Sequence, residues 1–125
     1  MFRVRKSLEF SAAHALRDYE GPCSRIHGHN YRVEVEVQGE ELDGARLLID
    51  FYEIDRMLRP LIGRLDHQFV NEIPPFDEIN PTAEAMAAWF YRELTEASRG
   101  RLRPGVRVAA VHLWETSDSC ASYGE

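Results

Sequence analysis

The stretch CSRIHGHNY, residues 23–31, places a cysteine four residues before the first of two histidines that are themselves two residues apart. Imidazole nitrogens and thiolates are both good zinc ligands. Cys23 could be the fourth ligand of a closed metal site, a reactive thiol beside an open one, or an inert thiol in a loop. A closed site would hold the fold together, whereas an open site would bind substrate and take part in chemistry.

Three of the five histidines fall on the apolar faces of two predicted strands. Residues 2–14 alternate between apolar and polar side chains and place His14 on the apolar face, and residues 27–38 do the same with His27 and His29. Imidazoles two residues apart on a strand point the same way, and one from a paired strand can complete a trio. Three neutral nitrogen ligands with an open position are typical of catalytic zinc. We therefore expect these histidines to bind Zn²⁺, an interpretation that we prefer to three unrelated polar side chains.

Two helices are predicted between these strands and the carboxyl end of the chain. Apolar residues recur every three or four positions within residues 47–67, with Asp50 as the predicted N-cap and Pro60 as a point where the helix could kink or split. Asn80, which is followed by a proline, is predicted to cap a second helix that ends near Ser98.

The remaining elements complete a β-β-α-α-β-β order. Residues 106–117 are rich in β-branched side chains and predict a third strand, and residues 119–125 predict a short fourth. This order indicates an α+β fold in which two helices cover one face of an antiparallel sheet. A chain of 125 residues is expected to form a single domain spanning residues 1–125. The edges of so small a sheet favour pairing between subunits.

The composition disfavours several classes of protein. A formal net charge of −6 lacks the basic surface that binds nucleic acid. The amino-terminal residues contain no apolar core of a secretory signal, and no run approaches the ~20 apolar residues that span a bilayer. We therefore expect a cytoplasmic protein with no nucleic-acid or membrane partner, in which Cys23 and Cys120 favour free thiols over a disulfide.

Six segments carry a resemblance to a known family. FSAAH, CSRIHGHNY, LLIDF, LDHQFVN, NPTAEAMAAW and WETS, in this order, are similar to motifs of the 6-pyruvoyl-tetrahydropterin and 6-carboxy-tetrahydropterin synthase family. The resemblance covers nearly all of the chain. It implies the tunnelling fold, whose four-stranded subunits pair edge to edge into trimeric barrels, two of which stack into a homohexamer.

The resemblance also implies a role for each residue of the site. It implies that His14, His27 and His29 bind zinc. It implies the following further roles: Cys23 as the catalytic base, Asp66 and His67 as a pair that relays protons, Glu115 as the carboxylate that anchors the pterin ring, and Thr82 as a residue lining the pterin pocket. A carboxylate suits the pterin edge because it can accept two hydrogen bonds at once. Adjacent residues rarely face one another, so we expect other groups or another subunit to assist the Asp66–His67 pair.

The implied substrate is 7,8-dihydroneopterin triphosphate. The spacing Cys-x₃-His-Gly-His resembles that of the queuosine-pathway enzymes, whereas the biopterin synthases carry Cys-x₅-His-Gly-His. We therefore expect 6-carboxy-5,6,7,8-tetrahydropterin, acetaldehyde and triphosphate as products, made by a zinc-dependent lyase. The alternatives are a 6-pyruvoyl-tetrahydropterin synthase, or a non-catalytic zinc- or pterin-binding oligomeric module. Arg17, Arg25 and Arg32 are candidates to bind the triphosphate.

Overall fold

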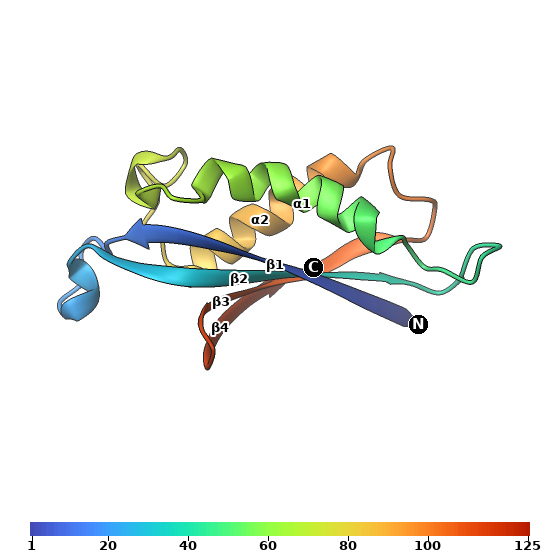
Figure 1. Ribbon diagram of the computed structural model, residues 1–125, viewed down its shortest axis with the longest axis horizontal. Helices are drawn as coiled ribbons and strands as arrows, with labels where there is room; N and C mark the ends of the chain where they lie inside the picture. The colour runs from blue at the N-terminus through green and yellow to red at the C-terminus, as the bar shows by residue number, and fades with distance from the viewer.

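The computed structural model describes residues 1–125 as a four-stranded antiparallel sheet with both helices on one face (Figure 1). The strands lie side by side in the order β1-β2-β3-β4. The predicted α+β class, element order and layering are confirmed. In chain order the elements are β1 (Phe2–His14), β2 (His27–Gly39), α1 (Phe51–Leu65), α2 (Ala83–Ser98), β3 (Arg107–Thr116) and β4 (Ser119–Gly124).

The pairing of β1 with β2 determines where the histidines lie. The two strands run antiparallel over their whole length, with His14 opposite His27 and Ala12 opposite His29. The connection between them, residues 15–26, leaves the sheet at the end where β1 finishes (Figure 1). The three histidines therefore share one end of one face of the sheet.

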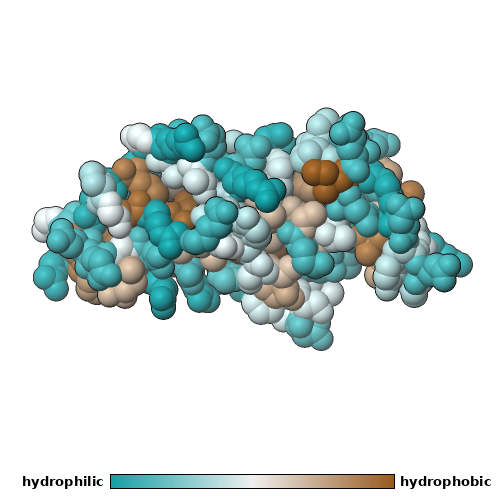
Figure 2. Space-filling model, turned by 180° about the vertical axis from the view of Figure 1, so that it is seen from behind, coloured by the Kyte–Doolittle hydropathy of each residue, from teal (hydrophilic) through white to brown (hydrophobic).

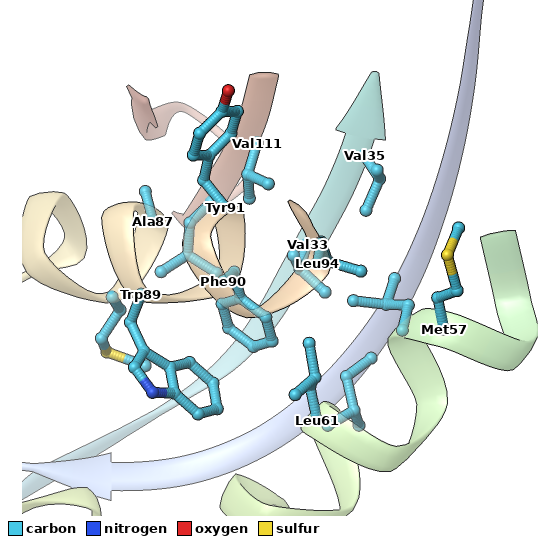
Figure 3. Close-up of a cluster of buried hydrophobic side chains, with 14 of the residues drawn as sticks. Val33, Val35, Met57, Leu61, Ala87, Trp89, Phe90, Tyr91, Leu94 and Val111 are labelled. Atoms are coloured by element: carbon cyan, nitrogen blue, oxygen red, sulfur yellow. The ribbon is translucent and has the colours of Figure 1, made fainter. Parts of the chain in front are cut away.

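The core lies between the sheet and the two helices. Contacts run from α1 to β1 and from α2 to β3 and β4. Figure 3 shows Phe90 and Leu94 of α2 and Leu61 of α1 gathered with Val33 of β2. Phe90 and Val33 are fully buried, and burying a side chain of this size stabilises a fold by about 1.5–3 kcal/mol. The helices therefore cover the face of the sheet that carries the histidines.

The first helix begins where the sequence predicts. Asp50 is its N-cap, and the Asp50 carboxylate accepts a hydrogen bond from the backbone N–H of Tyr52 at 2.8 Å. Pro60 lies inside α1 without splitting it into two helices.

The predicted cap of the second helix is wrong by two residues. Thr82 is the N-cap of α2, and its hydroxyl accepts from the backbone N–H of Ala85 at 3.1 Å. The amide of Asn80 instead makes two hydrogen bonds with the backbone of Arg17. Because Asn80 is used to hold a distant segment, the next residue with a suitable side chain caps the helix.

On the side shown in Figure 2, polar and charged side chains cover most of the molecule, and apolar ones form small separate groups. None of the helices is both long enough and apolar enough to cross a membrane.

Candidate metal centre and active site

Three histidine side chains converge where β1 ends and β2 begins. One ring nitrogen from each of His14, His27 and His29 lies within 4.8 Å of the other two. The Nε2 atoms of His14 and His29 are only 3.2 Å apart. Such separations suit donors to a single ion, because zinc–nitrogen bonds are about 2.0–2.1 Å long. We refer to these residues as the histidine triad.

Backbone carbonyls set the tautomers of two triad members. Nδ1 of His14 lies 2.8 Å from the carbonyl oxygen of Pro81, and Nδ1 of His27 lies 2.7 Å from that of Arg25. A carbonyl oxygen only accepts, so Nδ1 carries the proton in both rings and Nε2 keeps its lone pair. Histidines that bind metals are commonly held in this way. The donor set therefore fits a zinc ion.

Burial favours the neutral form of two triad members, His14 and His29. His14 is 1% exposed, and this burial lowers its pKa below the ordinary value for histidine. Burial also lowers the pKa of His29, although the nearby charge of Glu115 opposes the shift. Neutral imidazoles are the form that binds metals, so burial favours the metal-binding form of His14 and His29.

Glu115 faces the triad from the third strand. Val111 and Leu113 are buried on the helix-facing side of β3, and Glu115 follows them where the pairing of β3 with β4 is irregular. Its two carboxylate oxygens lie 3.7 Å from Nε2 of His14 and 4.0 Å from Nε2 of His29. The predicted pterin anchor therefore borders the predicted metal site within a single chain.

Asp66 and His67 form a direct pair beyond the end of α1. Nδ1 of His67 lies 3.0 Å from Oδ1 of Asp66, and the same oxygen accepts from the backbone N–H of Ser11 at 3.0 Å. The left-handed backbone of His67, with φ of 59°, turns its ring back over the preceding residue. Hydrogen bonds from Ser11 first, and then from His67, lower the pKa of Asp66.

An open cavity lies beside His67 and borders one member of the triad, His29. It has a volume of about 500 Å³, and His67 and His29 both line it. Gly28 and Ala13 form part of its wall. The segment after α1 is held against β1 there, because the backbone N–H of Ala13 donates to the carbonyl of Gln68 at 3.0 Å.

Cys23 lies outside the group of side chains that could share a metal ion. It sits in a single 3-10 turn, Pro22–Ser24, and its thiol is free and exposed. Its backbone carbonyl accepts from the N–H of Leu16 at 2.8 Å. The connection between β1 and β2 thus presents the thiol near the end of the sheet where the triad lies.

Two predicted binding residues are engaged elsewhere. The Thr82 hydroxyl caps α2, and Thr82 lines a different cavity of about 620 Å³ beside Trp89. The Arg17 guanidinium donates to three backbone carbonyls, which leaves it few donors for a triphosphate. Of the other two candidates, Arg25 is exposed and Arg32 lies over the Trp114 ring.

Asn71 and Asn80 were missed as residues that shape the site. Each binds the backbone of the connection that carries Cys23. The only sequence signal was that Asn80 precedes a proline, and this pattern is equally typical of a helix cap.

Comparisons with known proteins agree on one family. The family model described as "6-pyruvoyl tetrahydropterin synthase" matches residues 3–125. The "6-carboxy-5,6,7,8-tetrahydropterin synthase" of Synechocystis sp. is 35% identical, with 98% of this chain and 93% of that protein covered. The "Dihydroneopterin monophosphate aldolase" of Pyrococcus furiosus is 31% identical, with 93% of this chain and 91% of that protein covered. A solved structure of Caenorhabditis elegans 6-pyruvoyl tetrahydropterin synthase has the same fold, with a TM-score of 0.86 at 22% identity over 99% of this chain and 95% of its own.

Proposed function

Because the chain belongs to the 6-pyruvoyl tetrahydropterin synthase family, we propose that it is a zinc-dependent 6-carboxy-5,6,7,8-tetrahydropterin synthase. It would convert 7,8-dihydroneopterin triphosphate and water to 6-carboxy-5,6,7,8-tetrahydropterin, acetaldehyde and triphosphate, as a cytoplasmic step of queuosine biosynthesis. The observation that carries this proposal is the histidine triad beside Glu115, in a chain similar to a relative of that name. The Cys-x₃-His-Gly-His spacing supports the same product.

The triad is the proposed zinc site. His14 and His27 each present Nε2, since a backbone carbonyl holds the proton on Nδ1. His29 completes the set from the same strand as His27. Bound zinc supplies a Lewis acid that polarises hydroxyl oxygens and so makes the neighbouring C–H bonds more acidic.

Glu115 is the proposed anchor of the pterin ring. The ring edge offers an amide N–H and an amino group, and a carboxylate accepts from both at once. Glu115 has 27% of its side chain exposed, so its oxygens remain open to a ligand. Because the Glu115 carboxylate lies within 4.0 Å of two triad nitrogens, a ring bound to it holds the substrate side chain close to the triad.

The proton transfers fall to Cys23 and His67. Cys23 is the proposed general base that removes a proton from a carbon of the substrate side chain. Asp66 accepts the Nδ1–H of His67, so Nε2 of His67 remains free to give or take a proton inside the cavity that His29 also lines. The pair is the proposed partner that returns protons as the carbon chain is cleaved and triphosphate leaves.

Product analysis tests the reaction. The zinc-loaded protein is incubated with 7,8-dihydroneopterin triphosphate, and the pterin product and the aldehyde are identified by mass spectrometry. Acetaldehyde with 6-carboxytetrahydropterin is the expected result. A pyruvoyl product, or aldolase products like those that the name of the Pyrococcus furiosus relative indicates, would overturn the proposed specificity. No turnover by the zinc-loaded protein would favour a non-catalytic pterin-binding module.

The free edges of the sheet support the proposed homohexamer. β4 is an edge strand, and β1 is the other. Only the last part of β1 has a neighbour on its outer side, where Ala13 pairs with Phe69. Exposed strand edges favour pairing with another chain. Light scattering after gel filtration should give the mass of six subunits, and a monomeric mass would contradict this assembly.

A further inference from the structure

Two asparagines hold the connection between β1 and β2, which carries Cys23. Oδ1 of Asn71 accepts from the N–H of Ala15 at 2.9 Å, and Nδ2 of Asn71 donates to the Ala15 carbonyl at 2.8 Å. Asn80 binds Arg17 in the same way, with distances of 2.8 and 3.0 Å. Each amide thus satisfies both backbone groups of one residue, as a neighbouring strand would.

The Arg17 side chain adds hydrogen bonds in the opposite direction, from the connection to the segment that carries the asparagines. Its guanidinium donates to the carbonyl oxygens of Asn71 at 3.1 Å, Phe76 at 2.8 Å and Ile79 at 3.3 Å. These bonds tie residues 71–79 back onto the connection. We call Arg17, Asn71 and Asn80 the asparagine clamp. Since both segments supply side chains to it, neither can shift without breaking several hydrogen bonds.

The clamp reaches both Cys23 and the triad. Ala15 and Arg17 face the asparagines, whereas the N–H of Leu16, the residue between them, donates to the Cys23 carbonyl at 2.8 Å. Pro81, which follows Asn80, accepts from Nδ1 of His14 at 2.8 Å. The same short segments therefore fix the backbone beside the thiol and the ring of a triad member.

We propose that Asn71 and Asn80 are positioning residues that set the place of the Cys23 thiol relative to the triad. The catalytic consequence rests on the proposed function, in which Cys23 is the base. A misplacement of about 1 Å in a catalytic group can cost on the order of 10²-fold in rate. The asparagines themselves have no part in the reaction, since their amides are occupied by backbone groups.

Thiol reactivity tests the proposal without any pterin. Asn71→Ala and Asn80→Ala are made in a Cys120→Ser background, so that Cys23 is the single thiol. The rate of alkylation of Cys23 by iodoacetamide is measured with the zinc-loaded and the zinc-free protein. A nearby cation favours the thiolate, so zinc should accelerate alkylation in the parent. This acceleration should be largely lost in both variants, with zinc still bound at one ion per chain.

Asp43→Ala is the matched control. The Asp43 carboxylate accepts from the backbone N–H groups of Ala45 and Leu47, in the loop that follows β2 at the opposite end of the sheet (Figure 1). The Asp43→Ala substitution therefore removes a similar set of hydrogen bonds from a side chain to the backbone, far from Cys23. The control should keep the parent's zinc-dependent alkylation.

Steady-state kinetics provide the second measurement. The clamp variants should lose on the order of 10²-fold in kcat with KM little changed, and the control should keep both values. If the variants keep the zinc-dependent alkylation, as the control should, and lose only stability, the clamp is structural and the proposal is wrong. A parent whose alkylation is insensitive to zinc would also overturn it. Failure of the parent to turn over the pterin would instead count against the proposed function, and the alkylation result would still decide the role of the clamp.

Asn71→Asp and Asn80→Asp cover the case in which the alanine variants do not fold. Each keeps the size and the acceptor of the amide and loses the donor to the backbone carbonyl. These variants should show the same loss of zinc-dependent alkylation. If both variants kept the zinc-dependent alkylation of the parent, the proposal would be wrong.

Discussion

The carboxylate of Asp66 and the imidazole of His67 are paired directly, Oδ1 to Nδ1 at 3.0 Å, although the two residues are neighbours in the chain. The sequence suggested that such neighbours would need other groups or another subunit. The positive φ of His67 lets the two side chains meet directly, without another group between them. The backbone N–H of Ser11 fixes the shared oxygen from the other side, so β1 orients a pair that lies beyond the end of a helix.

The Asp66–His67 pair makes the stability of the fold depend on pH. Hydrogen bonds from Ser11 and His67 lower the pKa of Asp66 in the folded chain. A carboxyl group with a lowered folded pKa stabilises the fold above its unfolded value of about 4, and this contribution is lost as the pH falls through the folded pKa. Asp66→Asn should therefore destabilise the protein at pH 7 and much less under strongly acidic conditions. Urea unfolding at several pH values checks this, with the exposed Asp77→Asn as control. An equal loss at every pH would contradict it.

Metal removal should weaken the fold. An ion that binds only the folded chain stabilises it by about 2.7 kcal/mol at 100 times its Kd. Treatment with a chelator should lower Tm, and one equivalent of zinc should restore it. His27→Ala should abolish this response. His112→Ala should keep it, because His112 pairs with Ser122 and lies outside the triad. A response unchanged by His27→Ala would place the metal elsewhere.

Cys23→Ala should abolish turnover and leave zinc bound. The loss of a general base typically costs about 10²–10⁴-fold in rate. Zinc content is measured on the same samples, and Cys120→Ala serves as control because Cys120 is an exposed free thiol on β4. Loss of zinc from Cys23→Ala would show that Cys23 is a metal ligand, and the acid-base role would then be wrong.

Glu115→Gln should weaken pterin binding. Hydrogen bonds to a charged group contribute about 1.5–3 kcal/mol, so Kd for a pterin should rise roughly 10- to 100-fold. Calorimetry with a pterin that lacks the triphosphate isolates the ring. The control is Asp118→Asn, whose carboxylate accepts from Thr116 and Ser119 in the turn between β3 and β4. An unchanged Kd for Glu115→Gln would show that Glu115 does not anchor the pterin ring.

The sequence predicts the parts of the site that depend on periodicity. Alternation over residues 27–38 and over residues 2–14 is enough to place three histidines on one face, and antiparallel pairing then sets His14 opposite His27. The helices follow in the same way from apolar spacing, and Asp50 caps α1 because its carboxylate meets a free N–H.

The parts that depend on distant contacts were not predictable. Asn80 and Thr82 are both suitable helix caps, and the choice between them depends on Arg17, 63 residues away from Asn80. The left-handed backbone of His67 was not predicted, because glycine is the usual residue in that conformation and histidine adopts it only as an exception. The approach of Glu115 to the triad requires β3 to lie beside β2, which the order of elements alone does not specify.

The pairing of His14 with His27 would make a metal ion bound to the triad sensitive to the register of the two strands. Side chains alternate from one face of a strand to the other, so a slip of one residue between β1 and β2 would send one strand's ligands to the wrong side. Such a chain could offer at most part of the triad. Under the proposed function, zinc would then stabilise only the correctly paired hairpin, and the ion proposed for catalysis would also favour the chains that have folded in register.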